Sequence, residues 1–225
     1  MSSSSGHFRE RLRARAVASS ISVTNEQVEK LDRYFQLLVQ WSRKINLTGF
    51  DLHSISDQAI DRLFCEALAA AQYFPARATN WVDVGSGGGS PAVPLKIVLP
   101  NLPLTMVETR DRKCAFLREV TRELDLSRTT VLSSRVEEVA KAGMNRADVV
   151  TVRAVRSSPR LSHAIVQLLQ DDGMVLAFGA ANQPDWPDFT VRKDGPKLLR
   201  PSGSPLSMLT KAVFHVEQSR GKLLT

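Results

Sequence analysis

The sequence predicts an α/β fold built around a mostly parallel sheet, and three observations support this prediction. From about residue 80, apolar strand-like runs alternate with segments of helical periodicity, as in a doubly wound sheet. The run that ends near Asp83 leads into a glycine-rich stretch, residues 85–90, and then into a helical pattern. The next strand-like run ends on an acid, Glu108. Such a turn and acid are typical of proteins that hold an adenosine-containing ligand, because the glycines admit the ligand and the acid binds ribose hydroxyls.

Two regions are expected before the sheet. Residues 1–20 combine a serine run with four closely spaced arginines, and we expect a disordered basic tail. Residues 21–225 are expected to form one domain, in which 21–78 are a helical extension and 79–225 are the α/β core. In the extension, apolar spacing predicts a helix over 24–44, capped by Thr24 or Asn25, a turn at 46–49 and a second helix over about 56–73.

The core elements follow in order from the same patterns. Strands are predicted at 80–84, 103–108, 129–132, 147–152 and 173–179. Helices are predicted between them at about 91–98, 111–124, 135–142 and 159–170. Two edge strands, at 191–199 and 212–218, would complete a seven-stranded sheet.

Composition limits the class of protein and of partner. The chain has 225 residues, 43% hydrophobic and 24% charged, which is typical of a soluble globular protein. No apolar run approaches the roughly 18 residues of a membrane span, and no secretory signal is seen. The two cysteines and four histidines show no metal-ligand spacing, so we expect no metal and a reducing, cytoplasmic location. The net charge of +7 favours a polyanionic partner such as nucleic acid.

The glycine spacing indicates which ligand the turn holds. A dinucleotide fingerprint needs glycine at its first, third and sixth positions, and here the sixth is Ser90. This substitution argues against an NAD-dependent oxidoreductase. Glycines at 85, 87 and 89, preceded by Asp83, instead resemble motif I of S-adenosylmethionine-dependent methyltransferases; a plain glycine-rich loop that closes a strand is the alternative.

Together these pieces resemble one family, the bacterial 16S ribosomal RNA guanine-N7 methyltransferases called methyltransferase G or glucose-inhibited division protein B. Four parts of the chain carry the likeness: Trp41-Ser-Arg-Lys-Ile-Asn-Leu-Thr48; Val82 to Leu95 with the glycine loop; Glu108 with Arg112-Lys-Cys-Ala-Phe-Leu-Arg118; and Ser134-Arg-Val-Glu-Glu138 with Val152-Arg-Ala154. The resemblance implies a Rossmann-like, seven-stranded class I methyltransferase fold with an N-terminal helical cap.

Three positions depart from the family's pattern. The family's His-x-Leu-Asp-Ser element is expected where this chain reads Arg62-Leu-Phe-Cys-Glu66, and its Lys-Gly element reads Phe178-Gly179. The glycine expected after Pro91 is Ala92. The first two departures lie where the family's substrate face is expected. They leave open a methyltransferase for another substrate, and a cofactor-binding, ribosome-associated protein without catalysis.

The resemblance implies methyl transfer from S-adenosylmethionine to N7 of a guanine in 16S ribosomal RNA, free or in the small ribosomal subunit. N7 carries a free lone pair and loses no proton, so we name no catalytic base. The protein is expected to act as a monomer. Six cations are candidates for contacts with RNA phosphates: Arg43, Lys44, Arg110, Arg112, Lys113 and Arg118.

The resemblance also implies a cofactor site, residue by residue. Gly85 and Ser90 would contact the cofactor, and Gly87 and Gly89 would permit its close approach. Glu108 would bind the ribose. The remaining implied contacts come from four positions: Val136 and Glu137 at the adenine, Asp83 orienting the loop or reaching the methionine amino group, and Arg153 near the methyl-transfer point. Loop capping is the alternative role for Asp83, and a salt bridge is the alternative for Arg153.

Overall fold

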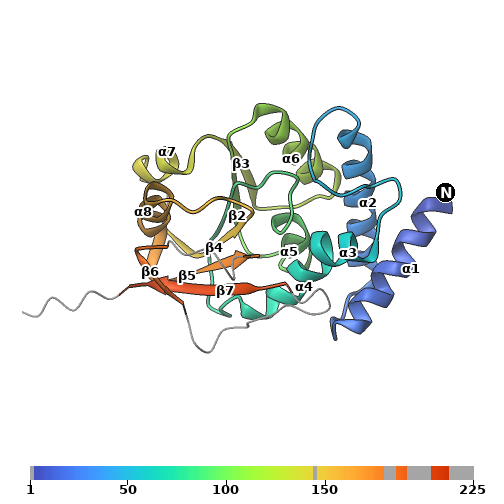
Figure 1. Ribbon diagram of the computed structural model, residues 1–225, viewed down its shortest axis with the longest axis horizontal. Coiled ribbons are helices and arrows are strands. Elements are labelled where there is room, and N and C mark those ends of the chain that lie inside the picture. Colours follow the sequence, from blue (N-terminus) through green and yellow to red (C-terminus); the bar gives the residue numbers. More distant parts are fainter. Residues whose placement is uncertain (1–2, 144–145, 180–185, 192–203, 213–225) are drawn as a thin grey trace, which may run out of the picture.

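A seven-stranded sheet forms the centre of the computed structural model, which describes residues 3–143, 146–179, 186–191 and 204–212 (Figure 1). The strands are β1 (Trp81–Val84), β2 (Leu104–Glu108), β3 (Thr129–Ser133), β4 (Ala147–Arg153), β5 (Leu169–Phe178), β6 (Phe189–Val191) and β7 (Leu206–Lys211). Their order is β3-β2-β1-β4-β5-β7-β6. Strands β1 to β5 are parallel, and β7 runs antiparallel to both β5 and β6. The α/β fold with a mostly parallel, seven-stranded sheet is confirmed.

The two edge strands differ from their predicted positions. Strand β6 ends where the first was predicted to begin, and residues 192–199 lie outside the described part of the chain. The second was predicted at 212–218, but β7 spans Leu206–Lys211, and residues 213–218 also lie outside the described part. Strand β7 reads Leu-Ser-Met-Leu-Thr-Lys and pairs with β5 on one side and with β6 on the other.

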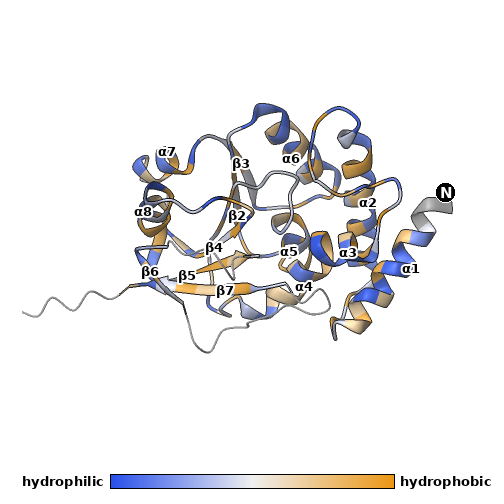
Figure 2. Ribbon diagram, in the orientation of Figure 1, coloured by the Kyte–Doolittle hydropathy of each residue, from blue (hydrophilic) through white to orange (hydrophobic). Residues whose placement is uncertain are grey.

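Alternating residues of the strands face two separate cores. Trp81, Leu104 and Met106 pack toward one face, whereas Val82 and Val107 pack toward the other. This is the period-two alternation of a strand covered on both sides. The first face is covered by α5 (Ala92–Val98) and α6 (Asp111–Glu123), and the second by α7 (Val136–Lys141) and α8 (Pro159–Leu168). Figure 2 shows the resulting concentration of hydrophobic residues along the sheet.

The helical extension adds to the first face. Helix α2 (Asn25–Ser42) begins with Thr24, whose side chain accepts from the backbone N–H of Gln27 while the Gln27 side chain accepts from Thr24. This capping box satisfies two of the N–H groups that a helix start leaves unpaired. Thr24, rather than Asn25, is therefore the N-cap.

The second predicted helix, over 56–73, is a continuous helical stretch with an irregular centre. It consists of α3 (Asp57–Ile60), a π-helical turn η1 (Asp61–Cys65), α4 (Glu66–Ala70) and a 3₁₀ turn η2 (Ala71–Tyr73). In η1 the backbone N–H of Glu66 bonds the carbonyl of Asp61, five residues back. Such a turn inserts one residue and rotates the faces of the helix on either side, and π-turns are frequent at functional sites.

From Ser3 onward, the segment expected to be a disordered tail is ordered, which corrects the sequence-based expectation. Residues Ser3–Ala18 form helix α1, and Phe8, Leu12 and Ala16 on one face are buried. The Phe8 ring stacks on the Phe35 ring with centroids 4.2 Å apart. Figure 1 shows α1 beside α2. Phe8, Leu12 and Ala16 recur at a spacing of four, as on one face of a helix. The arginines between them gave the segment the composition of a solvated tail.

Three of the four arginines of α1 form ion pairs with acids of the following helices: Arg9 with Asp32, Arg11 with Asp57, and Arg15 with Asp61. The Arg9–Asp32 pair is 2.6 Å long, and the Asp32 side chain is fully buried. The fourth, Arg13, donates to the Asn25 side chain at 2.8 Å. These contacts attach α1 to the extension.

None of the described helices is both long enough and apolar enough to cross a membrane.

We expect Phe8→Ala to lower the free energy of unfolding by about 3 kcal/mol or more, because a buried aromatic ring leaves a cavity when it is removed. Urea denaturation of the full chain measures this change. The matched control is Val17→Ala on the same helix, since Val17 is 76% exposed and its truncation should stay within about 0.5 kcal/mol. Equal, negligible effects of both substitutions would mean that α1 does not pack on the domain.

Candidate active site

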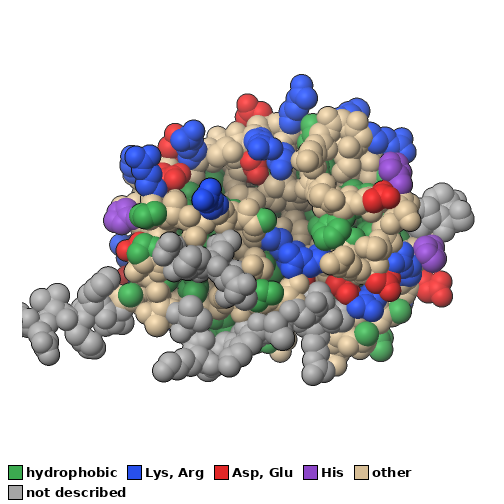
Figure 3. All heavy atoms as spheres, viewed as in Figure 1, with side chains coloured by type: hydrophobic (Ala, Val, Ile, Leu, Met, Phe, Trp, Pro, Cys, Tyr) green, Lys and Arg blue, Asp and Glu red, His purple; other side chains and the backbone are tan. Residues whose placement is uncertain are grey.

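A cleft of about 570 Å³ opens at the carboxyl ends of β1, β2 and β4. Ligands of open α/β sheets bind at this edge, where the strand order reverses on either side of β1. Five segments supply the lining residues: Leu38 with Asn46–Phe50, Arg62 with Leu63, Gly85–Ser90 except Gly89, Glu108–Arg110 with Lys113, and Arg153–Val155. Figure 3 shows a hollow near the middle of the molecule with Lys and Arg side chains beside it.

The glycine loop is held close to its neighbours on both sides. Gly85 has a φ of +73°, and a Cβ added there would lie 2.6 Å from the Val155 side chain. A Cβ on Gly88 would lie 2.6 Å from the carbonyl oxygen of Leu47. A larger residue at 85 would displace the Val155 side chain and adopt a strained positive φ, and one at 88 would displace the Leu47 backbone. The spacing argument did not single out Gly88, because its requirement comes from a loop 41 positions earlier in the sequence.

Glu108 lies at the bottom of the cleft, next to the glycine loop. Its side chain is mostly buried, and Oε2 accepts a hydrogen bond of 2.9 Å from the backbone N–H of Gly87. Oε1 accepts from the backbone N–H groups of Thr109 and Arg110 at 2.8 and 2.9 Å. The carboxylate therefore joins the end of β2 to the loop after β1. The sequence correctly placed this acid beside the glycines.

Asp83 lies beneath the loop rather than on the cleft surface. The Thr151 hydroxyl donates to Asp83 Oδ1, and the Trp81 indole N–H donates to that hydroxyl at 2.9 Å. Asp83 Oδ2 is buried and has no hydrogen-bond partner among the described residues. Burial raises the pKa of Asp83 to about 6. An unpaired buried carboxylate oxygen under a ligand loop is a candidate acceptor for a donor group of the ligand.

Arg153 ends β4 and is held in a buried network. Its Nη2 donates to Oε2 of Glu66 at 2.9 Å, and its Nη1 donates to the backbone carbonyl of Arg62. The guanidinium carbon lies 4.7 Å from the centre of the Phe178 ring. Desolvation lowers the pKa of Arg153 to about 10, although the Glu66 carboxylate opposes this shift. The salt bridge that the sequence left as an alternative is present, and the same side chain lines the cleft.

The helical extension completes the cleft and holds the loop. The buried Tyr34 hydroxyl donates to the carbonyl of Gly88 at 2.6 Å. The Ser90 hydroxyl donates at 2.9 Å to the carbonyl of Leu63 in the π-turn η1. Burial raises the pKa of Tyr34 well above its usual value, so the hydroxyl stays protonated and able to donate. The roles of Tyr34 and Leu63 in holding the loop were not predicted from the sequence, because hydroxyl contacts between distant segments leave no local pattern.

The predicted cofactor residues are only partly brought together. Gly85, Gly87, Ser90, Glu108 and Arg153 line the cleft. Asp83 and Gly89 lie under the loop: Asp83 is buried, and a Cβ on Gly89 would meet the side chains of Val93 and Tyr34.

Val136 and Glu137 do not line the cleft. Val136 is buried in the core under α7, and Glu137 lines a separate groove between α7 and α8. The family pattern placed both residues after β3. The helix α7 begins at Val136, however, and its first turn directs that side chain into the core rather than toward the glycine loop.

The predicted RNA-contacting cations divide into three groups. Arg110 and Lys113 line the cleft. Arg43 and Lys44 line a neighbouring depression that shares residues 46–48 and Phe50 with the cleft. The other two lie on α6: Arg112 is exposed, and Arg118 donates to the carbonyl of Val131. The cleft and the neighbouring depression thus carry four of the six candidates.

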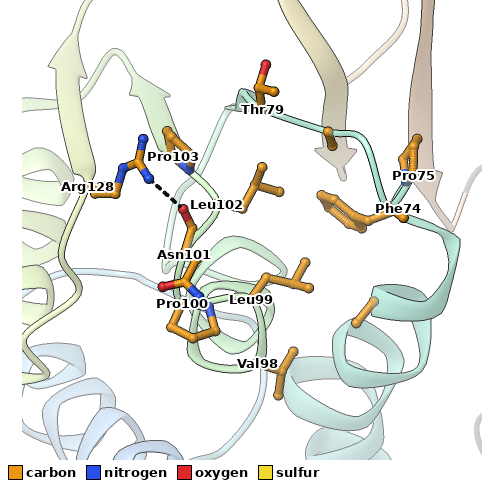
Figure 4. Close-up of a pocket in the computed structure, with 13 residues that line it drawn as sticks. Phe74, Pro75, Thr79, Val98, Leu99, Pro100, Asn101, Leu102, Pro103 and Arg128 are labelled. Carbon is orange, nitrogen blue, oxygen red and sulfur yellow. Dashed lines mark hydrogen bonds between the residues drawn. The ribbon is translucent and has the colours of Figure 1, made fainter.

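A second cavity of about 530 Å³ lies at the opposite edge of the sheet (Figure 4). Its walls come from the segments before β1 and β2, and include Phe74, Leu99, Leu102 and Pro103. Arg128 is its one charged lining residue and donates to the carbonyl of Asn101. No predicted site residue lies there.

Among the described residues, no group of three His, Cys, Asp or Glu side chains could hold a metal ion.

The raised pKa of Asp83 predicts how stability depends on pH. A carboxyl group with a pKa of 3.8 when unfolded and about 6 when folded binds more protons in the folded state over that range. The contribution of Asp83 to the free energy of unfolding is therefore largest below about pH 4, and it is lost as the pH rises through about 6. Relative to Asp83→Asn, the wild-type free energy of unfolding should fall as the pH is raised from 4 to 7, measured by urea denaturation.

Asp172→Asn is the control for that comparison. Arg77 lowers the pKa of Asp172, so its contribution has the opposite sign and grows as the pH rises above its folded pKa. The same pH trend for both variants, each relative to wild type, would contradict the assignment to Asp83.

Comparison with known proteins gives one consistent result. A family model described as rRNA small subunit methyltransferase G, named GidB, matches residues 27–186. A ribosomal RNA small subunit methyltransferase G from Brevibacillus brevis is 34% identical over 167 residues, which cover 73% of this chain and 69% of that protein. The protein of the same name from Streptococcus pneumoniae strain R6 is 32% identical over 170 residues, or 74% and 70% of the two chains.

Solved structures agree at the level of the fold. The crystal structure of TrmN from Thermus thermophilus matches with a TM-score of 0.50 and 19% identity, over 65% of this chain and 48% of that one. At this identity the likeness concerns the arrangement of the sheet and its helices alone. The match of the family model over most of the cleft-forming segments, together with relatives above 30% identity, identifies the family. The chain belongs to the GidB family, rRNA small subunit methyltransferase G.

Proposed function

We propose that this protein transfers a methyl group from S-adenosylmethionine to N7 of a guanine in the RNA of the small ribosomal subunit. Family membership supports an S-adenosylmethionine-dependent rRNA methyltransferase. The observation that carries the finer assignment is the chemistry of the cleft. Its lining includes no histidine, and Glu108 is its one carboxylate among the lining residues of the described chain. N7 of guanine suits such a site because it needs no general base.

The residues present fit this cofactor. The glycine loop leaves room for a ligand backbone, and a side chain at Gly85 or Gly88 would close it. Glu108 Oε2 now accepts a hydrogen bond from the backbone N–H of Gly87. It is placed to accept hydrogen bonds from ribose hydroxyls in place of that bond. Asp83 Oδ2, buried and unpaired, is a candidate acceptor for the methionine ammonium, directly or through water. Gly87, Ser90 and Arg153 line the same space, and Gly89 lies under the loop.

The residues of the cleft contribute position rather than proton transfer. S-adenosylmethionine supplies an electrophilic methyl group on a positively charged sulfur. The N7 lone pair forms the new N–C bond, the C–S electrons return to sulfur, and the positive charge passes to the guanine. No proton leaves N7. The chain accelerates this step by holding the two reactants in line and excluding water.

Cations around the cleft are placed to meet an RNA backbone. Lys113 and Arg110 line the cleft, and Arg43 and Lys44 line the depression next to it. Contacts of these residues with phosphates would orient the RNA without reading its sequence. The proposed substrate is 16S ribosomal RNA, free or assembled into the small subunit, and the proposed active form is a monomer in the cytoplasm.

Incubating the protein with labelled S-adenosylmethionine and small ribosomal subunits that lack this modification tests the reaction. We expect label in RNA and N7-methylguanine after nuclease digestion and mass spectrometry. Label at another atom or in another molecule would favour a methyltransferase for a different substrate. Binding of S-adenosylhomocysteine without any transfer would favour a non-catalytic, ribosome-associated protein.

Glu108→Ala should weaken binding of S-adenosylhomocysteine by about 1–3 kcal/mol, the usual effect of losing a charged hydrogen-bond partner. Isothermal titration calorimetry measures the affinity. Glu108→Gln keeps one acceptor oxygen and should lose less.

Glu137→Ala is the matched control, since Glu137 lies outside the cleft and should bind normally. Affinity that is unchanged in Glu108→Ala would remove Glu108 from the cofactor site. Weaker binding of S-adenosylhomocysteine by Glu137→Ala would instead support the contact between Glu137 and adenine that the family pattern suggested.

A further inference from the structure

Two arginines share one buried carboxylate beside the cleft. Glu66 is only 1% exposed at its side chain, and its Oε2 and Oε1 lie 2.9 Å from Arg153 and 3.4 Å from Arg62. These three side chains come from α4, β4 and the π-turn η1. The Glu66 carboxylate therefore contacts both guanidinium groups at the wall of the cleft.

The topology places these three side chains at the end of the cleft where the methyl-accepting base would bind. Glu108, the proposed ribose ligand, stands at the end of β2, and the glycine loop follows β1. A ligand that spans both must extend onward toward β4, which is the next strand in the sheet. Arg153 ends β4, and Gly179 follows β5. The nucleophile therefore approaches near the ends of β4 and β5, where Arg62 and Arg153 lie.

The two arginines differ in how far they are already engaged. The Arg153 side chain is 12% exposed, and it is held by Glu66, by the carbonyl of Arg62 and by the Phe178 ring. The Arg62 side chain is 34% exposed and lines the cleft. Among the described residues, Arg62 makes its hydrogen bonds through Nη1 alone, to Glu66 and to the Ser204 hydroxyl. Its Nη2 and Nε make no hydrogen bond within the described part of the chain, and so can donate to a ligand.

The position of Arg62 is fixed from three sides. Arg153 binds its carbonyl, and Ser90 binds the carbonyl of the next residue, Leu63. Its guanidinium is anchored at Nη1 by Glu66 and Ser204, and a Cβ placed on Gly179 would lie 3.7 Å from Nη2. A long side chain held at its backbone and at one nitrogen presents its other donors in a defined direction, which is the property needed to read a base edge.

We propose that Arg62 recognises the acceptor guanine by donating a hydrogen bond to O6, while Glu66 and Ser204 position its guanidinium and Arg153 holds its backbone carbonyl. This inference rests on the proposed N7 methylation. Guanine presents N7 and O6 side by side as acceptors, whereas adenine presents an amino group in place of O6. A donor at O6 favours guanine and leaves the N7 lone pair free for the methyl group.

The test compares Arg62→Ala and Arg62→Lys with wild type on small ribosomal subunits that lack the modification. We expect kcat/KM for N7 methylation to fall about 10- to 100-fold in Arg62→Ala, which is the range for loss of one base-specific contact. Arg62→Lys, which keeps the charge and a donor, should lie between the two. The affinity for S-adenosylhomocysteine should not change, and the salt dependence of KM should keep its wild-type slope.

Arg77→Ala is the matched control, because Arg77 also pairs with one acid but lies in the segment before β1, at the other edge of the sheet. It should retain wild-type methylation. Wild-type kcat/KM in Arg62→Ala, or loss of S-adenosylhomocysteine binding in that variant, would overturn the inference. A salt slope lowered by about one unit would overturn it in favour of a phosphate contact. Failure of the wild-type protein to form N7-methylguanine would refute the proposed function itself.

Discussion

The close contact between the glycine loop and the helical extension is the constraint on which the cleft depends. Gly88 meets the Leu47 carbonyl so closely that no Cβ fits between them, and the Tyr34 hydroxyl binds the Gly88 carbonyl. Ser90 ties the end of the loop to the π-turn. The loop is therefore positioned by segments outside the α/β core. The extension acts as one wall of the cleft as well as a cover for the sheet.

Buried charges around this contact are compensated in different ways. Glu108 is held by three backbone N–H groups, and Glu66 by two arginines. Asp83 has one hydroxyl donor and one unpaired oxygen, and its pKa rises accordingly. A buried carboxylate with an unmet acceptor is costly unless something binds there. Of these three acids, Asp83 is the one with an unpaired oxygen among the described residues, and it lies directly under the loop proposed to hold the cofactor.

The positive charge of the chain is distributed differently from what the sequence suggested. Arg9, Arg11 and Arg15 are engaged by acids within the fold rather than carried on a free tail. These pairs cancel within the domain and contribute little to attraction of a polyanion. The cations that remain near the cleft, such as Lys113 and Arg110, are therefore the ones that a nucleic acid would meet.

Local pattern was sufficient for strands β1 to β5 and the helices between them, for the glycine loop, for the position of Glu108 and for the family, since periodicity and turn chemistry are set by neighbouring residues. Local pattern was not sufficient where the environment of a residue is set by partners far away in the sequence. The arginines of α1 resemble a solvated tail until Asp32, Asp57 and Asp61 are brought beside them.

The π-turn, the need for glycine at 88 and the sharing of Glu66 by two arginines also came only from tertiary structure. The glycine requirement comes from the Leu47 carbonyl, and the second pairing of Glu66 comes from Arg153. No local spacing records which distant backbone or charge will lie opposite a residue. The π-turn is a local bond from Glu66 to Asp61, which the helical periodicity over 56–73 did not separate from an ordinary α-helical turn.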